Sequence, residues 1–522
     1  MRRLLRFLLI TTFILFVVRL GSNSFDPDLG WHLQFGQSFW QNHIFPFTDL
    51  ATWSHYGQIW INHEWGGDLL LWPIYHHFGY FALLVATSLP IIVGFLFVHW
   101  SFRKKITTSA LLASFFSLWS VEYIIIPRLA MVTPLFLAVL LASLERARSA
   151  WVCLTIPLTM YAWSLLHGSW ALGFIVIGIY LTGRFAANLN RDDRLPFWKK
   201  EAAEWRPLIY MFIGGGLAAL VILINPYGSA LYREIWQYFN QNSFKNFIDE
   251  WRPSYTFPIY WQSLVLVGIS LPAFALTAIR RQLTITHTFL YLAFLIAGLQ
   301  AKRNMMLLAI ISAPLLSTAG TTVWGKIRKK IPDIAQSMFV RKTIFFFGTS
   351  AAILAILFNL LEIQTGDIWK NTALLNHFNM PVGAIQFLAR EPSGPIFNYF
   401  SWGGYLDWNL PQDKIFIDGR GTVTWRWNQN QTLLEKYWQL VYDPKGLTEL
   451  NKGPTRYILL PATLTDVSVP ENDYLNRWLF PPGKWPYYYQ FTETKLEKEL
   501  DNSPRWKKIY SDGMANIWEK II

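Results

Sequence analysis

Eleven apolar segments, separated by polar loops, restrict the fold of this chain more than any other feature. A segment needs about 20 mostly apolar residues to cross a bilayer as a helix, and the shorter ones here require tilting or shielding by neighbours. The composition agrees, because 52% of the 522 residues are hydrophobic and only 15% are charged. We therefore expect a multi-pass α-helical membrane protein. The predicted spans are residues 4–20, 80–100, 107–125, 130–144, 150–166, 170–184, 207–224, 260–278, 285–301, 304–320 and 343–361.

Basic residues recur in every second loop between these segments. They precede the first span and fill the loops at 103–105, 145–148, 191–200, 280–281, 326–330 and 341–342. Loops rich in Lys and Arg stay on the cytoplasmic side, so the residues after 361 are predicted to lie outside. These loops also account for the net charge of +13, which argues against a nucleic-acid partner. We expect a protein of the bacterial cytoplasmic (inner) membrane, surrounded by the lipid bilayer.

Two parts are expected along the chain: a membrane domain of residues 1–361 and a soluble tail of residues 362–522. The first outward loop, residues 21–79, should contain helices at 30–40 and 64–75 and an extended stretch at 47–60. In the tail, a helix at 382–389 and strands at 414–417, 456–460 and 515–518 predict a small α/β domain. The single cysteine, Cys153, excludes an intramolecular disulfide.

An acidic pair, Asp26 and Asp28, follows directly after the first apolar segment. A carboxylate at the mouth of a membrane helix costs free energy unless it is solvated, paired or used in chemistry. Either residue could act as a general base, and Asp28 could also bind a divalent cation such as Mg²⁺ or Mn²⁺. The alternative is structural, because Asp28 is well placed to cap a helix that begins near Gly30.

His63 and Glu64, together with His32, form a second polar group in the same loop. They could supply a further acidic or substrate-binding position that faces the same cavity. The alternative is a capping and interfacial network, in which Asn62 caps the next helix. The spacing after His63 does not contain the HExxH pattern of zinc proteases.

Three arginines at outward turns, Arg128, Arg252 and Arg303, are candidates for binding a phosphate or diphosphate. The guanidinium fork suits that task, and Arg is tolerated near a membrane end that water reaches. Their other role would be to extend toward lipid headgroups. His167, at a helix–helix turn beside Gly168, is either a further ligand-binding residue or a cap.

Two glycine-containing motifs stand out in the tail, at residues 402–405 (Trp-Gly-Gly-Tyr) and 418–420 (Asp-Gly-Arg). They could bind sugar or peptide, although glycines more often serve turns. Asp418 and Arg420 could also pair with each other.

These motifs, taken in order, resemble the GT-C superfamily of integral-membrane glycosyltransferases, in particular its uncharacterised bacterial members. The resemblance covers most of the chain and also includes Glu250 with Trp251, the segment 225–228 and Asn304. It implies a polyprenyl-phosphate-linked sugar donor, an active site on the outer side, and a lipid, glycan or protein acceptor. It further implies that Asp26 or Asp28 is the catalytic base of an inverting transfer. The candidate substrate-binding residues are His32, His63, Glu64, Arg128, His167, Glu250, Arg252 and Arg303.

Other functions fit the same features less well. A flippase or transporter of lipid-linked glycans would place polar groups near the middle of the bilayer, often on broken helices in paired repeats. Here the spans are largely uncharged at mid-depth, and no repeat is visible. A polymerase or ligase of surface polysaccharide is chemically close to the favoured function. A scaffold for an envelope complex would not depend on Asp28.

Overall fold

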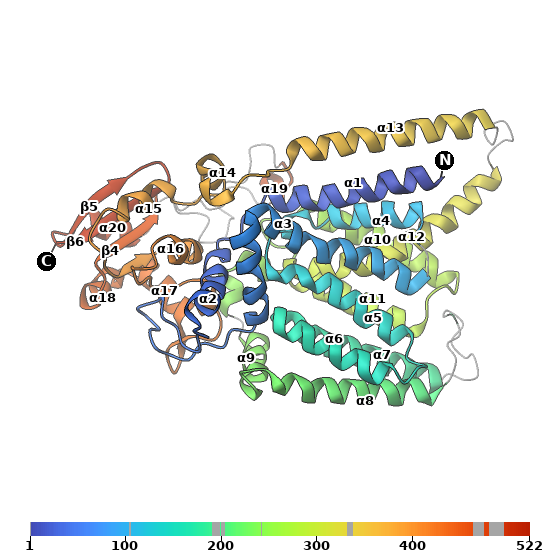
Figure 1. Ribbon diagram of the computed structural model, residues 1–522, viewed down its shortest axis with the longest axis horizontal. Helices are drawn as coiled ribbons and strands as arrows, with labels where there is room; N and C mark the ends of the chain where they lie inside the picture. Colours follow the sequence, from blue (N-terminus) through green and yellow to red (C-terminus); the bar gives the residue numbers. More distant parts are fainter. Residues whose placement is uncertain are drawn as a thin grey trace.

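The structure, a computed structural model, describes residues 2–103, 106–189, 199, 204–241, 243–330, 338–462, 474–479 and 495–521. A helical bundle occupies one end of the molecule and a smaller domain containing a β-sheet occupies the other (Figure 1). Between them lies a layer of short helices and loops that contains most of the predicted site residues. The chain is thus a multi-pass helical membrane protein with a C-terminal sheet domain.

Within the described residues, each predicted span corresponds to a helix of the bundle. Seven of these helices are long and apolar enough to cross a membrane, whereas α4, α5, α6 and α11 are shorter. The predicted span 107–125 is the most shortened, because its helix ends at Trp119. The bundle helices are α1 (Arg2–Ser22), α3 (Trp65–Arg103), α4 (Thr108–Trp119), α5 (Thr133–Glu145), α6 (Val152–Leu166), α7 (Ala171–Leu189), α8 (Trp205–Val221), α10 (Trp261–Ile279), α11 (Ile285–Gln300), α12 (Met305–Lys330) and α13 (Met338–Glu362).

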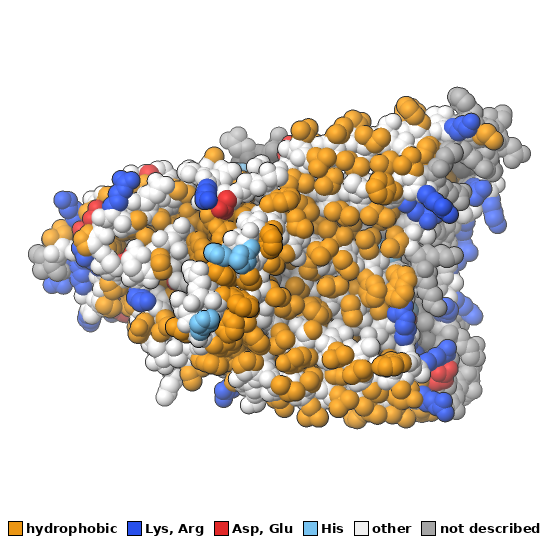
Figure 2. Space-filling view, in the orientation of Figure 1, with side chains coloured by type: hydrophobic (Ala, Val, Ile, Leu, Met, Phe, Trp, Pro, Cys, Tyr) orange, Lys and Arg blue, Asp and Glu red, His pale blue; other side chains and the backbone are white. Residues whose placement is uncertain are grey.

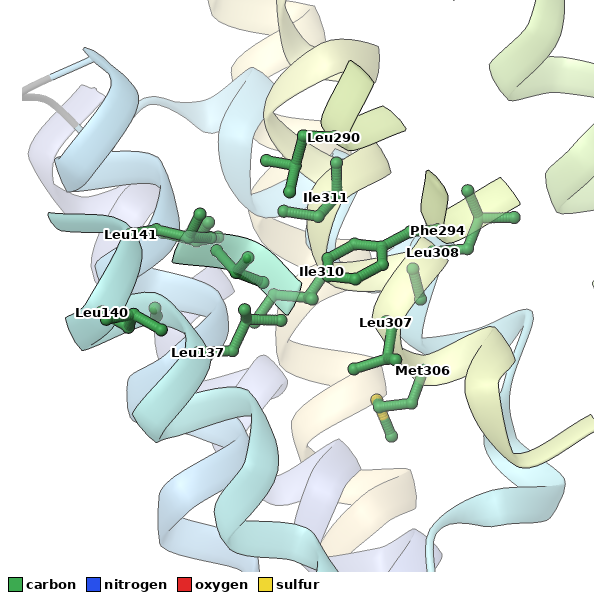
Figure 3. Close-up of a cluster of buried hydrophobic side chains, with 14 of the residues drawn as sticks. Leu137, Leu140, Leu141, Leu290, Phe294, Met306, Leu307, Leu308, Ile310 and Ile311 are labelled. Carbon is green, nitrogen blue, oxygen red and sulfur yellow. The ribbon is translucent and has the colours of Figure 1, made fainter. Parts of the chain in front are cut away.

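The interior of the bundle is apolar and tightly packed. Leucines of α5 meet side chains of α11 and α12 there (Figure 3). Leu137, Leu140, Leu308 and Ile310 have no exposed surface. The short helix α5 packs extensively against α3, so its neighbours shield it from lipid, as a short membrane helix requires.

Charge is distributed unevenly over the outside of the molecule. Figure 2 shows a broad apolar surface over the bundle, and it shows Lys and Arg gathered at the bundle end farthest from the sheet domain. This arrangement agrees with the predicted topology, in which basic loops share one side of the membrane.

The helix α3 contains a break near its beginning. Gly79 has φ 77° and ψ −179°, which is not helical, and it separates the first turns of α3 from the long apolar part. A positive φ is easily adopted by glycine because it lacks a Cβ. The predicted helix at 64–75 and the predicted span at 80–100 are therefore the two halves of one kinked element.

The layer between the bundle and the sheet domain is built from short elements. The predicted helix at 30–40 is present as α2 (Leu29–Asn42), and it packs against both α3 and the sheet domain. The remaining elements of this layer are one α-helix, α9 (Ser229–Asn240), and short 3₁₀ helices, labelled η: η1 (Glu122–Ile124), η2 (Leu129–Val132), η3 (Gly168–Trp170), η4 (Ile222–Ile224), η5 (Ser243–Asn246), η6 (Asp249–Trp251) and η7 (Lys302–Asn304).

The tail contains a four-stranded sheet in the order β1-β4-β6-β5, in which β1 and β4 are parallel and the other pairs antiparallel. Its strands are β1 (Ile396–Asn398), β4 (Tyr457–Pro461), β5 (Trp506–Ser511) and β6 (Ala515–Lys520), with a separate pair β2 (Arg426–Asn428) and β3 (Gln431–Thr432). Its helices are η9 (Ile368–Lys370), α14 (Thr372–His377), α15 (Val382–Leu388), η10 (Phe400–Trp402), α16 (Gly403–Asn409), η11 (Gly419–Gly421), α17 (Leu433–Tyr442), α18 (Gly446–Lys452), α19 (Tyr474–Leu479) and α20 (Lys495–Asp501).

The first outward loop joins the edge of this sheet. Ile415 forms single bridges to Ile396 of β1 on one side and to Thr52 of the loop on the other. The prediction of a strand at 414–417 is therefore wrong, because only Ile415 of that segment pairs. The loop and the tail share backbone hydrogen bonds at this edge, from Trp53 to the Ile415 carbonyl (2.8 Å) and from Ile415 to the Ala51 carbonyl (3.1 Å).

Candidate functional site

The acidic pair lies where α1 has ended and α2 begins. Asp28 occupies the N-cap position of α2, but its side chain accepts no capping hydrogen bond. The Asp26 side chain instead stabilises the turn before α2, since its Oδ1 accepts a hydrogen bond from the Asp28 amide at 3.1 Å. Asp26 is buried and Asp28 only partly so. The capping alternative for Asp28 thus finds no support in its side chain.

Burial raises the pKa of Asp28 to about 7, and the negative charge of Asp26 adds to this effect. A carboxylate with such a pKa exchanges protons near neutral pH, which an ordinary exposed aspartate does not. Asp28 is therefore suited to general-base chemistry.

The tail domain lies directly against the acidic pair. A Cβ added to Gly419 would collide with the Asp28 carboxylate, and one added to Gly404 would collide with the Pro27 carbonyl. In both places the absence of a side chain permits the close approach. The glycines of the two tail motifs therefore form one side of the acidic site.

His32, on α2, lies between two carboxylates of the α3 start. Its Nδ1 is 2.5 Å from Asp68 Oδ1, and its Nε2 is 3.4 Å from Glu64 Oε2. Burial alone would lower the pKa of His32, but Asp68 and Glu64 outweigh it and raise that pKa to about 9. His32 is consequently a cation at neutral pH. Asn62 completes the group by donating to Asp68 (2.6 Å) and by accepting the Glu64 amide (2.9 Å), as a cap would.

Glu64 is surrounded by histidines. His167 Nε2 lies 3.2 Å and His63 Nε2 lies 3.6 Å from Glu64 Oε1. Burial lowers the pKa of both histidines, that of His63 to about 4, so both are neutral. Burial raises the pKa of Glu64 to about 7, opposed by the charge of His32 and reinforced by those of Asp68 and Asp26. Glu64 is therefore a second carboxyl group that can exchange protons near neutral pH.

The His167 ring has a fixed orientation. Its Nδ1 accepts the Ser169 amide at 3.0 Å, so the neutral ring carries its proton on Nε2, which faces Glu64. The Ser169 hydroxyl lies 2.6 Å from the same Nδ1 and is itself held by Trp163 and Thr133. His167 thus caps η3, as one alternative predicted, and also contacts a candidate site residue.

Arg128 and Arg303 meet at one carboxylate. Arg128 Nη2 lies 2.6 Å from Glu250 Oε2, and Arg303 Nη1 lies 3.0 Å from Glu250 Oε1. Burial alone would raise the pKa of Glu250, but the two guanidinium groups lower it to about 2. Asp26 and Asp28 are near enough that their charges help to raise the pKa of Arg128. The acidic pair therefore lies within electrostatic range of Arg128.

Arg252 has a contact within its own loop. Its Nη1 donates to the Phe257 carbonyl at 2.8 Å. Next to it lies the pair of Lys302 Nζ with Asp249 Oδ1, at 2.5 Å, and Lys302 is only 1% exposed. A contact of Arg252 with substrate stays a prediction.

Sequence reasoning missed Asp68 as a member of the site and Lys302 as a structural residue beside it. Asp68 follows Glu64 by four residues, which places both on one face of a helix, and that spacing was the available signal. Lys302 precedes Arg303, and its burial was not expected from the sequence. A lysine is rarely buried without a partner, and no local pattern indicated one. The partner, Asp249, lies 53 residues away.

Arg420 of the second tail motif connects the tail with the first outward loop. Its Nη2 lies 2.6 Å from Asp418 Oδ2 and 3.2 Å from Asp49 Oδ1. Both carboxylates are fully buried. The guanidinium also lies over the Trp60 ring at 4.7 Å. The expected pairing of Asp418 with Arg420 is present, and Asp49 extends it across the two parts of the chain.

The residues that the structure describes contain no group of three or more His, Cys, Asp or Glu side chains that could hold a metal ion by themselves. Mg²⁺, however, is commonly bound by one or two carboxylates together with substrate phosphate oxygens. Asp26 and Asp28 could supply such carboxylates, and a bound cation would neutralise a phosphate leaving group. A divalent cation at Asp28 stays a prediction.

No protein-family model matches the chain, and no curated protein matches it either. Three similar solved structures are of oligosaccharyltransferase from Archaeoglobus fulgidus, named AglB in the first of them. The complex with an inhibitory peptide and a dolichol-phosphate has a TM-score of 0.56 at 13% identity, covering 88% of this chain and 69% of that one. The form tethered to an acceptor peptide has a TM-score of 0.53 at 13% identity, and the apo form 0.51 at 12%; both cover 87% of this chain and 69% of that one. The chain therefore has the fold of these oligosaccharyltransferases, which confirms the GT-C-like fold predicted from its sequence.

Proposed function

We propose that this protein transfers a sugar from a polyprenyl-phosphate-linked donor to an acceptor on the outer side of the membrane. The observation that carries the proposal is the position of Asp28. This carboxylate lies at the end of the bundle that meets the sheet domain, accepts no hydrogen bond that caps α2, and has a pKa raised to about 7. Arg128 and Arg303 lie in the same site and could hold the phosphate of the donor.

The fold adds support for the donor class. The oligosaccharyltransferase structures hold a dolichol-phosphate in one case and an acceptor peptide in another. Fold alone does not determine chemistry, so we base the donor on the combination of this fold with the arginine pair. The acceptor is a lipid, a glycan or a protein.

The proposed reaction is a single displacement. The nucleophile of the acceptor attacks the anomeric carbon from the side opposite the phosphate, and the Asp28 carboxylate takes the proton that this nucleophile loses. The bond between the anomeric carbon and the phosphate oxygen breaks, and its electron pair leaves with that oxygen. Arg128 and Arg303 would stabilise the resulting negative charge. We favour Asp28 over Asp26 as the base because Asp26 already accepts the Asp28 amide.

The proposed setting is a bacterial cytoplasmic membrane, with residues 1–361 as the membrane domain and the tail outside. The distribution of Lys and Arg within the bundle supports this orientation, since on the bundle they gather at the end opposite the tail (Figure 2). In this orientation the acidic pair, the arginines and the tail motifs all lie on the outer side.

A single displacement predicts inversion at the anomeric carbon. The measurement is the anomeric configuration of the product, determined by NMR after transfer from a donor of known configuration. A product with the opposite configuration is expected. Retention would contradict the proposed mechanism, because it requires a covalent intermediate and a second carboxylate that attacks the sugar.

Transfer activity is expected to increase with pH through about pH 7. A carboxylate works as a base only when ionised, and the pKa of Asp28 and that of Glu64 are each raised to about 7. The measurement is kcat/KM from about pH 5 to about 9. Glu64→Gln is the control. If Asp28 is the base, kcat/KM of this variant still falls as the pH is lowered through about 7. A kcat/KM that stays constant from about pH 5 to about 9, as expected for a carboxylate with the ordinary pKa of about 4, would contradict the assignment.

A further inference from the structure

Glu250 holds both candidate phosphate-binding arginines. Each of its carboxylate oxygens faces a different guanidinium, at 2.6 Å for Arg128 and 3.0 Å for Arg303. All three side chains retain contact with solvent, with exposed fractions of 30% for Glu250, 18% for Arg128 and 21% for Arg303. An anion from outside can therefore reach the place where Glu250 lies.

The two guanidinium groups are arranged to hold an anion between them. The Arg303 guanidinium lies over the Trp251 ring at 4.2 Å, which fixes its plane. Nε of Arg128 is buried and has no hydrogen-bond partner among the described residues. Glu250 therefore leaves the Nε–H donor of Arg128 without an acceptor. A ligand with more acceptor oxygens than a carboxylate could accept a hydrogen bond from it.

Glu250 is not needed to hold its own loop in place. The loop containing η6 is attached to η7 by the ion pair of Lys302 with Asp249, and Lys302 also donates its amide to the Arg252 carbonyl at 2.9 Å. Lys302 is almost completely buried, which marks this pair as the structural attachment. Glu250 could thus leave the arginines without release of the loop.

We propose that Glu250 occupies the position of the donor phosphate and that the incoming lipid phosphate displaces it. This inference rests on the proposed function, since it takes the donor to be a polyprenyl phosphate derivative. Glu250 keeps two like charges close together in the absence of substrate. The phosphate then replaces its two carboxylate oxygens with non-bridging phosphate oxygens, of which a monophosphate-linked sugar has two, polyprenyl phosphate itself three and a diphosphate-linked sugar four. The measured affinity for the donor is lowered, because the free site is mostly in its self-occupied state.

The test is the binding of polyprenyl phosphate to wild type and to Glu250→Gln in lipid nanodiscs. Gln keeps the shape of the side chain but removes the charge that competes with the ligand. We expect Glu250→Gln to bind polyprenyl phosphate about tenfold more tightly, equivalent to about 1.4 kcal/mol. Glu250→Asp, whose shorter side chain cannot reach both arginines, should show a smaller gain and serves as the second variant if the first does not fold.

The matched control is Glu122→Gln, which removes the same charge from η1 by the same substitution. No gain in affinity is expected there, because the Glu122 carboxylate accepts a hydrogen bond from Gln262 at 3.2 Å and pairs with neither arginine. An equal gain in this control would show a general electrostatic effect and overturn the inference.

The outcomes separate this inference from the proposed function. Unchanged or weaker binding by Glu250→Gln, with measurable binding by wild type, would overturn the displacement while leaving the donor class in place. Absence of binding in both proteins would overturn the donor class together with this inference. Inorganic phosphate, titrated in parallel, should bind more weakly than the lipid; equal affinities would indicate a site for free phosphate instead.

Discussion

Replacement of Asp28 by Asn is expected to reduce the rate of sugar transfer by about 10²–10⁴-fold, the usual contribution of a general base. Asn has nearly the same shape but accepts no proton at neutral pH. The Asp28 side chain makes no capping hydrogen bond, so its loss should leave folding intact. The measurement is kcat with a labelled polyprenyl-phosphate sugar in proteoliposomes, with the unfolding temperature of each protein measured alongside.

Asp26→Asn is the matched control for this prediction. Asn can still accept the Asp28 amide through its side-chain oxygen, so the local turn is preserved. A much smaller loss of activity is expected, through the altered charge next to Asp28. A larger loss in Asp26→Asn than in Asp28→Asn would identify Asp26 as the base. Full activity in both variants would contradict the role of the pair and make Glu64 the next carboxylate to test.

Replacement of Arg420 by Gln is expected to lower the free energy of unfolding by about 3–5 kcal/mol, the typical cost of removing one partner from a buried ion pair. The guanidinium is 5% exposed, and the carboxylates of Asp49 and Asp418 are fully buried. Without Arg420, both carboxylates would lie uncompensated between the first outward loop and the tail. The measurement is the unfolding temperature in detergent or nanodiscs.

Arg456→Gln is the control for Arg420. Its pair with Glu519 is much more exposed, at 35% and 29%, and exposed pairs usually contribute at most about 1 kcal/mol. A similar unfolding temperature for the two variants would contradict the special role of Arg420. Because Gly419 adjoins both Arg420 and Asp28, we also expect Arg420→Gln to lose activity at temperatures where it is still folded.

The membrane part of the fold could be predicted from the sequence because its cause is local. A long apolar run has to become a helix in a bilayer, where no water satisfies the backbone polar groups, and each predicted span corresponds to a helix. The ends were less predictable, as the early end of α4 at Trp119 shows. The kink of α3 at Gly79 was expected only as a boundary between two segments.

The candidate site was partly predictable. Polar and ionisable residues near the outer ends of apolar segments indicated Asp28, Glu64 and Arg303 individually. Their partners depend on packing between distant parts of the chain: Arg128 and Glu250 are 122 residues apart, and the Ser54 hydroxyl donates to the Phe416 carbonyl across 362 residues. No local pattern determines such pairs. For the same reason the attachment of the first outward loop to the tail sheet could not be predicted.

The central claim is tested most directly by following a labelled sugar in sealed proteoliposomes that contain the wild-type protein and a polyprenyl-phosphate sugar. We predict that the label moves from the lipid to an acceptor on the outer side and that polyprenyl phosphate or diphosphate remains in the membrane. Label that stays attached to its lipid while it crosses from one leaflet to the other would contradict sugar transfer and identify the protein as a flippase.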